Sequence, residues 1–288
     1  MNFAKLQGAG NDFVLVETDD VKRDWSRVSK SICDRRFGVG ADGLLLLLPS
    51  RVADFRMRIF NSDGSEAEVC GNGLRCLVRY VLNRGLASEE ARDISIETIS
   101  GVRRAKVTRT EGELAEIQVS LGMPRFEATD IPVLIEPGSA NVVDIKSMLG
   151  YTITVDKQRL PLNLVSMGNP HAVYFGDEPV ADFPLASVGP RVEHHIIFPR
   201  RANFEAARVL SREEIEARVW ERGVGETLAC GSGAAAVAVA AQLNGLVDNR
   251  VKIRLPGGIL NVVWNGAGEV FLGGPAQMVF TGTWLGEV

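Results

Sequence analysis

The sequence predicts an α+β fold of two pseudo-symmetric lobes, each a mixed or antiparallel barrel-like sheet wrapped around a central helix. Most of the chain consists of short segments in which apolar and polar residues alternate, as they do in half-buried strands. One motif, Cys-Gly-(Asn/Ser)-Gly followed by helix-forming residues, occurs twice, at Cys70 and at Cys230. The copies lie about 160 residues apart, a little over half of the 288-residue chain. This spacing favours a duplicated lobe over a solenoid, whose repeats are shorter.

The predicted helices and strands follow from composition and alternation. Three segments have helical composition, and each ends before a glycine: 26–37 before Gly38, 74–82 before Gly85 and 234–241 before Gly245. Ser26 is expected to cap the first of them. The remaining segments are predicted strands, and in each lobe they are expected to form a sheet around one central helix. The predicted strands are 13–16, 44–48, 55–59, 94–98, 102–108, 114–121, 152–155, 162–166, 172–175, 201–210, 251–255, 259–264, 270–272 and 278–284.

The segment 211–220 fits two structures. Ser211 and Glu214 resemble a helix capping box, whereas the alternation of apolar and polar residues favours a strand. A strand would bring Glu221 to the same end of the lobe as Cys230. We therefore predict a strand.

The predicted boundary between the lobes lies at Met123-Pro124, where the alternating pattern breaks. The first lobe, 1–123, carries the first cysteine motif, and the second lobe, 124–275, carries the second. The last strand, in 276–288, is expected to return to the first lobe. Domains of this size have enough residues for a core of their own.

Composition excludes several classes of protein. The net charge of −4 and the pI near 5.6 give no basic face for nucleic acid. No apolar run approaches the roughly 20 residues that cross a bilayer, and the first residues lack the apolar segment of a signal peptide. We expect a cytoplasmic protein that binds neither nucleic acid nor membrane.

The four cysteines indicate neither a disulfide framework nor a metal site. Four in 288 residues is too few for a disulfide-dense scaffold. Cys70 and Cys76 are six residues apart, which is not the spacing of a zinc-binding pair, and the chain contains no paired-histidine motif. Inside their helices, Cys33 and Cys76 are expected to be inert, buried thiols.

The two motif cysteines stand at sites suited to acid/base chemistry. Each precedes small residues at the first turn of a predicted helix, among backbone N–H groups without intrahelical partners. These groups and the helix dipole favour a nearby anion. The same field favours thiolate over thiol, so Cys230 is predicted to have a lowered pKa.

Two such cysteines suggest stereoinversion. If the two helix N-termini face each other across a cleft, they hold a small carboxylate between a thiolate and a thiol. One group removes a proton from the adjacent carbon and the other delivers a proton to the opposite face. The N–H groups would stabilise the enediolate-like charge, as an oxyanion hole does. No cofactor is expected, because no lysine has a Schiff-base context and Gly-x-Gly-x-x-Gly is absent.

The residues around both cysteines resemble one enzyme family, diaminopimelate epimerase, and the resemblance runs essentially end to end. It is carried by Asn-Ser-Asp-Gly-Ser-Glu at 61–66 leading to Cys-Gly-Asn-Gly-Leu-Arg-Cys at 70–76, by Glu-Arg-Gly-Val-Gly-Glu-Thr at 221–227 leading to Ala-Cys-Gly-Ser-Gly-Ala at 229–234, and by 3–13, 167–171 and Asn203. The family interconverts LL- and meso-diaminopimelate without a cofactor, for lysine and peptidoglycan precursors. It implies the two-lobed fold and a homodimer.

The resemblance also implies roles for individual residues. Cys70 and Cys230 would be the acid/base pair, and His171 and Glu221 would support the protonation states of the thiols. The substrate site would be formed by Asn11, Asn61, Gly71, Asn72, Asn169, Asn203, Glu221, Arg222, Gly231 and Ser232. One departure is Gly43, where some family members have Gln, so a contact with the substrate is in question there.

Other functions stay open from the sequence. Racemases of proline and hydroxyproline share the two-cysteine plan, although their motifs differ around both cysteines. A thiol redox protein, with Cys70 and Cys230 as a reversible disulfide, is an alternative from another class, as is an amino-acid binding protein. The adjacent His194 and His195 are predicted to lie on a solvent-facing strand and not to form a catalytic pair. Which cysteine acts on which stereoisomer does not follow from the sequence.

Overall fold

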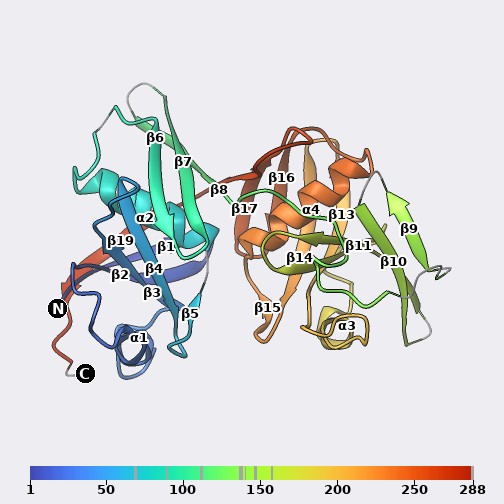
Figure 1. The fold of residues 1–288 in the computed structure, drawn as a ribbon, viewed down its shortest axis with the longest axis horizontal. Coiled ribbons are helices and arrows are strands. Elements are labelled where there is room, and N and C mark those ends of the chain that lie inside the picture. The colour runs from blue at the N-terminus through green and yellow to red at the C-terminus, as the bar shows by residue number, and fades with distance from the viewer. Residues whose placement is uncertain are drawn as a thin grey trace. The chain divides into compact units, whose positions relative to one another are not determined.

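The chain forms two compact units (Figure 1). The computed structural model describes residues 1–67, 70–88, 90–110, 113–135, 139, 141–145, 148–156 and 158–286. The first unit contains residues 1–120 and 273–288, and the second contains residues 121–272. The predicted domain boundaries differ from these by three residues at each junction. The assignment of a separate functional lobe to each unit stays a prediction.

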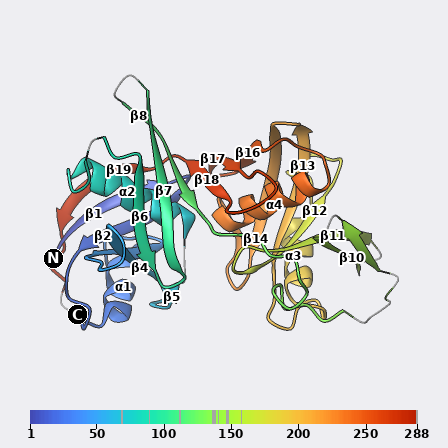
Figure 2. The ribbon, with the colours of Figure 1, turned by 45° about the horizontal axis from the view of Figure 1, so that its top comes forward.

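The first unit joins the two ends of the chain in one sheet. It consists of β1 (Asn2–Gly8), β2 (Asn11–Glu17), α1 (Trp25–Cys33), β3 (Gly43–Leu48), β4 (Phe55–Asn61), β5 (Glu66–Ala67), α2 (Gly71–Asn83), β6 (Asp93–Thr98), β7 (Gly101–Thr110), β8 (Glu113–Ser120) and β19 (Gln277–Thr283). Strand β1 pairs antiparallel with both β2 and β19 (Figures 1 and 2). Strand β19 therefore lies in the first unit, although the second unit precedes it in the sequence.

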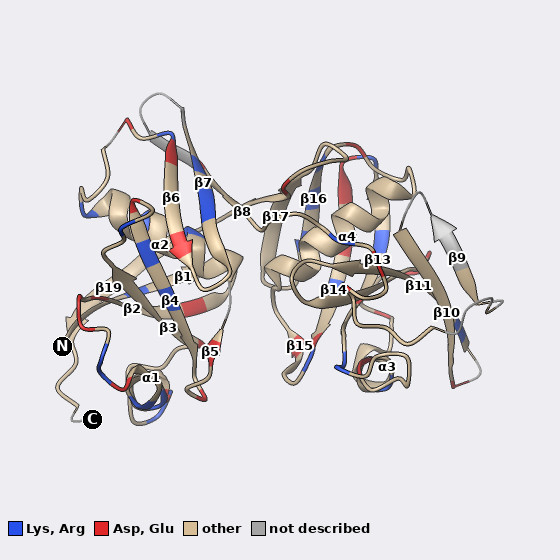
Figure 3. Cartoon of the chain, viewed as in Figure 1, with Lys and Arg blue, Asp and Glu red and all other residues tan. Residues whose placement is uncertain are grey.

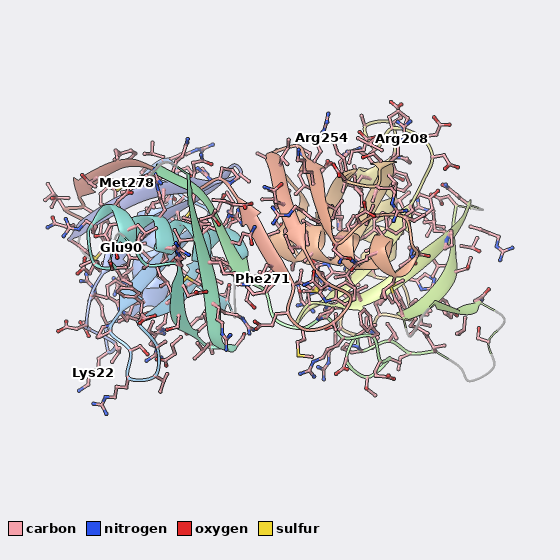
Figure 4. The ribbon with its side chains drawn as sticks, turned by 90° about the horizontal axis from the view of Figure 1, so that it is seen from above. Lys22, Glu90, Arg208, Arg254, Phe271 and Met278 are labelled. Atoms are coloured by element: carbon pink, nitrogen blue, oxygen red, sulfur yellow. The ribbon has the colours of Figure 1, made fainter. Side chains whose placement is uncertain are left out.

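The second unit is continuous in sequence. It consists of β9 (Val142–Ile145), β10 (Met148–Val155), β11 (Gln158–Ser166), β12 (Pro170–Phe175), α3 (Leu185–Glu193), β13 (Asn203–Ser211), β14 (Glu214–Glu221), β15 (Gly225–Thr227), α4 (Gly231–Leu243), β16 (Arg250–Leu255) and β17 (Gly258–Val263), and β18 (Phe271–Gly274) leads back to the first unit. Charged side chains of its strands, such as Arg208 and Arg254, point outward (Figure 4).

Both units repeat one arrangement of elements. In the first, β2 and β3 are parallel with α1 between them in sequence, and β4 pairs with β5 and runs parallel to β6. In the second, β12 and β13 are parallel with α3 between them, and β14 pairs with β15 and runs parallel to β16. Helices α2 and α4 follow β5 and β15 and have 13 residues each. The duplicated α+β fold predicted from the twin motifs is confirmed.

Helices α2 and α4 are the central helices of their units. Helix α2 packs against β1, β2, β8 and β19, and α4 packs against β11, β12, β13 and β17. Every residue from 233 to 241 in α4 is buried. The helix carries no charged residue (Figure 3), as expected of a helix surrounded by protein. Its alanines fill this central position with little loss of side-chain entropy.

Helix α1 is shorter than predicted and begins earlier. The predicted helix is present, but its predicted bounds, 26–37, and its predicted cap, Ser26, are wrong. The cap is Asp24, whose carboxylate accepts a hydrogen bond from the Arg27 N–H at 3.0 Å. The helix ends at Cys33 because Asp34 turns away with extended backbone and accepts hydrogen bonds from two N–H groups beyond it. Local side-chain hydrogen bonds thus replace the last predicted turn.

Helix α3 was not predicted, so among the described residues the second unit has two helices where the sequence predicted one. Pro190 lies inside α3 and obscures its helical pattern. His194 is the C-cap of this helix, with its N–H bonded to the Pro190 carbonyl, and His195 follows in a turn. The prediction of a strand at these two histidines is therefore wrong. Of the segment 211–220, residues 214–220 are confirmed as a strand, within β14, whereas Ser211 ends β13 and 212–213 form the turn between the two strands.

Candidate active site

Cys70 is the N-cap of α2. Its backbone is extended, with φ −140° and ψ 116°, and its sulfur accepts a hydrogen bond from the Gly73 N–H at 3.4 Å. This places the sulfur in the position usually taken by a Ser or Asp oxygen, against N–H groups that the helix leaves unpaired. Gly71 and Asn72 form the first turn, which is buried.

Asn11 faces Cys70 with its amide oxygen. That oxygen lies 3.8 Å from the Cys70 sulfur and accepts from the Asn72 amide at 3.2 Å. The other end of Asn11 donates to Asp42 Oδ2 at 2.8 Å. Since an ionised carboxylate only accepts hydrogen bonds, Asp42 fixes which end of the amide faces the cysteine. An amide oxygen in this position can accept a hydrogen bond from the Cys70 S–H.

An ion-pair network supports this arrangement. Asp12 binds Lys5 at 2.6 Å and Arg35 at 2.7 Å, and Arg35 also binds Asp42 at 2.7 Å. Burial of Asp12 opposes its ionisation, but hydrogen bonds from Arg35 and Lys5 outweigh burial and hold the pKa of Asp12 far below 3.8. The network anchors Asp42, which in turn orients Asn11. The sequence analysis did not identify it, because its members are spread over 5–42.

Arg75 is a fully buried cation beneath the first turn of α2. Its Nη2 donates to Asn72 Oδ1 at 2.8 Å. Burial lowers the pKa of its guanidinium. Because Arg75 holds the Asn72 oxygen, the Asn72 amide nitrogen is directed to Asn11. Both asparagines near Cys70 therefore have fixed orientations.

Cys230 occupies the equivalent position in the second unit. It is the N-cap of α4, with φ −119° and ψ 117°, and accepts from the Gly233 N–H at 3.4 Å. The Ser232 hydroxyl lies 3.5 Å from its sulfur. The prediction of a lowered pKa for Cys230 is wrong in this structure. Burial and the charge of Glu221 raise the pKa well above 9.0, and the hydrogen bonds from Ser232 and Gly233 do not compensate.

A row of polar side chains leads from Ser232 into the core. Asn169 Nδ2 donates to Ser232 Oγ at 3.4 Å, and Asn169 Oδ1 lies 2.9 Å from His171 Nε2. His171 Nδ1 lies 2.7 Å from Glu205 Oε1, and both side chains are fully buried. His171 is thus connected to Cys230 through two other residues.

Glu205 was missed by the sequence analysis. It lies in the middle of an otherwise apolar stretch of β13, and burial raises the pKa of its carboxyl while His171 lowers it. A single glutamate among residues such as Phe204 and Ala206 is unusual in a buried strand. That contrast is the signal that could have identified it.

The remaining predicted residues of the second unit lie at the ends of β13 and β14. Asn203 donates to the Pro170 carbonyl at 2.9 Å and accepts from the Arg222 N–H at 2.9 Å. Glu221 accepts from the Thr227 hydroxyl at 2.6 Å. Arg222 is exposed and donates to the Arg200 carbonyl. The amide of Asn203 therefore shapes the loop that carries Arg222.

Neither a metal cluster nor a membrane helix occurs in the described part of the chain. No three His, Cys, Asp or Glu side chains gather there in a way that could hold a metal ion. Among the same residues, no helix has both the length and the apolar composition needed to span a bilayer.

A family model described as "Diaminopimelate epimerase" matches residues 3–127 and 163–279. The chain belongs to the diaminopimelate epimerase family. The diaminopimelate epimerase of Moorella thermoacetica is 46% identical over 285 residues, which are 98% of each chain. That of Desulforudis audaxviator is 44% identical over 288 residues, 99% of each chain. The predicted resemblance is therefore confirmed.

Solved structures show the same fold at low sequence identity. A "predicted epimerase" of Pseudomonas aeruginosa has a TM-score of 0.71 at 17% identity, with 99% of each chain covered. A probable proline racemase of Agrobacterium radiobacter has a TM-score of 0.69 at 15% identity, covering 98% of this chain and 92% of that one. The diaminopimelate epimerase family thus shares its architecture with proteins of other names.

Gly43, which the sequence analysis singled out because some family members are expected to have Gln there, is the first residue of β3. A Cβ atom at this position would lie 2.8 Å from the Phe60 carbonyl oxygen. A glutamine here would therefore require β4 to move. Asn61, at the end of β4, donates to Ser65 at 2.9 Å. The role of Asn61 in substrate binding, like the roles of the other predicted site residues, stays a prediction.

Proposed function

We propose that this member of the diaminopimelate epimerase family interconverts LL- and meso-diaminopimelate, with Cys70 and Cys230 as its two acid/base groups. The enzyme is an isomerase of lysine and peptidoglycan precursor synthesis. The observation that carries the proposal is the pair of N-capping cysteines, each of which accepts a backbone hydrogen bond at 3.4 Å. A structural cysteine has no need of this position, since Ser, Asp or Asn caps a helix better.

The reaction inverts one α-carbon by moving two protons. A thiolate removes the α-proton and becomes a thiol, while the opposite thiol delivers its proton to the other face and becomes a thiolate. Charge that develops on the substrate carboxylate is stabilised by the first N–H groups of α2 and α4, in the manner of an oxyanion hole. The overall charge of the protein does not change.

Binding of the substrate would generate the thiolate. In the ligand-free protein, burial and Glu221 keep Cys230 protonated. The α-ammonium group of an amino acid brings a positive charge beside the cysteines, which lowers a thiol pKa. The thiol of Cys230 should therefore react slowly with alkylating reagents until the substrate binds.

Binding of the distal amino-acid group is assigned to Asn11, Asn61, Asn169, Asn203, Glu221 and Arg222, as the family implies. Its ammonium suits the Glu221 carboxylate, and its carboxylate suits the Arg222 guanidinium. His171 supports the thiol chemistry through Asn169. This chemistry requires no cofactor.

Location in the cytoplasm and a homodimer complete the proposal. One surface that a second copy could cover lies on β19, where Met278 (Figure 4), Val279 and Phe280 are 37%, 57% and 47% exposed. Adjacent exposed apolar residues of this size often mark an interface. Sedimentation equilibrium would measure the oligomeric state, and a Val279→Glu variant would be monomeric if β19 forms the contact.

The proposed function is tested by proton NMR of LL-diaminopimelate in deuterium oxide. The wild-type protein is expected to remove the α-hydrogen signal while the meso isomer appears. Cys70→Ala and Cys230→Ala should each reduce inversion at least about 10³-fold, because either loss removes one of the two protons. Cys33→Ala is the matched control, since Cys33 is a buried thiol of α1 whose pKa burial raises to about 11. Full inversion by either active-site variant would refute the two-cysteine mechanism.

A further inference from the structure

The repeat of elements makes residues of the two units equivalent. In the first parallel pair, Phe13 of β2 lies beside Gly43 of β3, and Leu45 follows two residues later. In the second pair, His171 of β12 lies beside Asn203 of β13, and Glu205 follows two residues later. Phe13 therefore corresponds to His171, and Leu45 corresponds to Glu205.

The helix glycines support this equivalence independently. A Cβ atom on Gly73 of α2 would lie 3.1 Å from Leu45 Cδ2, and a Cβ atom on Gly233 of α4 would lie 3.0 Å from Glu205 Oε1. The residue three positions after each cysteine thus packs on the same place in its unit. That place is apolar behind Cys70 and carries a carboxyl group behind Cys230.

Stability does not explain the ionisable pair in the second unit. The side chains of His171 and Glu205 are both fully buried, so folding removes both from water. Glu205 Oε2 has no hydrogen-bond partner among the described residues, so the carboxyl group recovers only part of its hydration. Replacing such pairs with apolar residues of similar volume is often neutral or stabilising, and the first unit already uses Phe and Leu at these positions.

The hydrogen bonds from this pair toward Cys230 form one directed chain. The amide oxygen of Asn169 can only accept, so His171 Nε2 carries a proton and donates it to Asn169. Asn169 Nδ2 then donates to Ser232 Oγ. Since this hydroxyl oxygen already accepts a hydrogen bond, its own proton is available for the Cys230 sulfur, 3.5 Å away.

Glu205 lies at the buried end of this series of hydrogen bonds and determines the direction in which they donate. With Nε2 protonated, the His171 ring is either a cation that donates from Nδ1 or a neutral ring that accepts a proton from the carboxyl group. Glu205 Oε1, at 2.7 Å, satisfies both states. An apolar neighbour would satisfy neither, and the ring could then take the opposite tautomer.

We propose that Glu205 is a positioning residue for Cys230, acting through His171, Asn169 and Ser232 to direct a hydroxyl proton at the sulfur when it is a thiolate. Glu205 touches neither substrate nor sulfur in this role. The equivalent positions in the first unit are Phe13 and Leu45, which carry no ionisable group, so a pair of this kind belongs to the second unit alone of the two equivalent places. The catalytic part of this inference rests on the proposed function, whereas the effect on the thiol does not.

The test replaces the pair by its counterpart from the first unit. The double variant His171→Phe, Glu205→Leu has no net change of charge if the pair is ionised and retains an apolar packing that this fold already contains. Each cysteine is alkylated with iodoacetamide at pH 9 without substrate, and its rate is read by peptide mass spectrometry. We expect the rate at Cys230 to fall at least about fivefold, because loss of the directed hydroxyl proton outweighs loss of the Glu205 charge, which raises the pKa of Cys230. The rate at Cys70 should remain within twofold.

Steady-state kinetics of the same variant give a second readout. We expect kcat to fall at least about tenfold with a smaller change in KM, because the chain supports the thiolate more than it holds the substrate. Ser232→Ala removes only the last link and should reproduce the slower alkylation of Cys230. If the double variant does not fold, the alkylation rate of Cys230 in Ser232→Ala tests the inference instead.

Imidazole ¹⁵N NMR tests the inner link directly, since the chain has only three histidines. His171 should show a protonated Nε2 in the wild type and in Glu205→Gln, whose amide can still bond to Nδ1. It should lose that fixed state in Glu205→Leu. Unchanged alkylation and kcat in folded variants would overturn the inference. Absence of epimerisation by the wild type, with the alkylation difference intact, would instead overturn the proposed function.

Discussion

Glu221 affects Cys230 through its charge and, as proposed, binds the substrate through the same carboxylate. It is the second cause, after burial, of the raised pKa of Cys230. Its carboxylate is held by Thr227 and not by a cation in any hydrogen bond or ion pair described here. The two effects of Glu221 can therefore be separated by measurements with and without the substrate.

Glu221→Gln is expected to make Cys230 more reactive and the enzyme less active. Loss of the negative charge lowers the pKa of Cys230, so alkylation at pH 8 should accelerate by roughly tenfold for each unit of pKa. Loss of the contact with the ammonium group should lower kcat/KM at least about tenfold. Alkylation of Cys230 in the wild type should still rise with pH beyond 9.0.

The control for this variant is Glu216→Gln, in the same strand. Glu216 accepts from the Val180 N–H and lies 3.6 Å from Arg208, which points outward from the second unit (Figure 4). Substitution of Glu216 should change neither the alkylation rate of Cys230 nor kcat/KM. Slower alkylation in Glu221→Gln would show that the charge of Glu221 does not set the pKa of Cys230.

Asp12 links stability to pH. Its pKa is depressed in the folded protein, so its contribution is present above the unfolded value near 3.8 and is lost as the pH falls toward the folded value. Asp12→Asn should therefore cost on the order of 2 kcal/mol in the free energy of unfolding at pH 7. The difference from the wild type should shrink below pH 4. Urea unfolding at pH 7 and pH 3 measures it, and exposed Asp19→Asn is the control; a difference independent of pH would contradict the ion-pair account.

The sequence analysis identified the two cysteines as acid/base candidates, but it did not identify how charged residues shift the pKa of Cys230. Cys70 and Cys230 stand out because a short motif recurs, and a motif is a local pattern. The pKa of Cys230 depends on burial and on Glu221 and Glu205, which reach it through the fold. The helix N-terminus alone suggested the opposite shift. Burial and charge effects from residues that are distant in the sequence cannot be recognised in one short segment of it.

At the scale of elements, the glycines three residues after each cysteine distinguish α2 from α4. Gly73 faces the end of a flexible Leu45 side chain, whereas Gly233 faces Glu205 and two methyl groups of Val219 at 3.3 Å. The leucine can rotate away, but Glu205 is held by His171. The two helices therefore tolerate an added methyl group differently.

Gly233→Ala should cost about 1–3 kcal/mol more in the free energy of unfolding than Gly73→Ala, as overpacking in a rigid core does. Both substitutions gain similarly in helix propensity, so that term cancels. Thermal unfolding of the two variants measures the difference. Equal melting temperatures would show that Glu205 shifts freely and that the space around it is not fixed.

The elements that sequence analysis missed are those that end or bend through local hydrogen bonds. Alternation identified strands with one buried face, such as β14 and β16, but the short strands β5, β9 and β15 were not predicted. Helix α1 ends at Cys33 because the Asp34 carboxylate binds the next turn, a choice that composition leaves open. Helix α3 contains Pro190, which in most sequences argues against a helix.

At the scale of the whole molecule, β19 completes the first unit. It pairs with β1 from Asn2 to Gln7, and the Met1 and Trp284 backbones exchange hydrogen bonds of 2.7 and 2.8 Å. Without β19, β1 would become an exposed edge with unpaired backbone groups. The second unit contains none of these residues.

A chain that ends at residue 275 should therefore lose the structure of the first unit and retain that of the second. The buried thiols of Cys33 and Cys76 in the first unit should become reactive toward a thiol reagent, while Cys230 keeps its wild-type rate. A chain that ends at residue 284 retains β19 and is the control. Protected Cys33 and Cys76 in the shorter chain would show that the first unit does not depend on β19.

The pairing of β1 with β19 reverses the usual order of folding during protein synthesis. The second unit is continuous, so the ribosome delivers all of its strands in succession, and it can close as soon as they emerge. The first unit is begun earlier but waits for a partner strand translated near the end. Until then β1 has one unpaired side in the crowded environment of the nascent chain. Although domains translated first generally fold first, here we expect the unit translated first to be finished last, after β19 is made, and the proposed two-cysteine reaction requires both units.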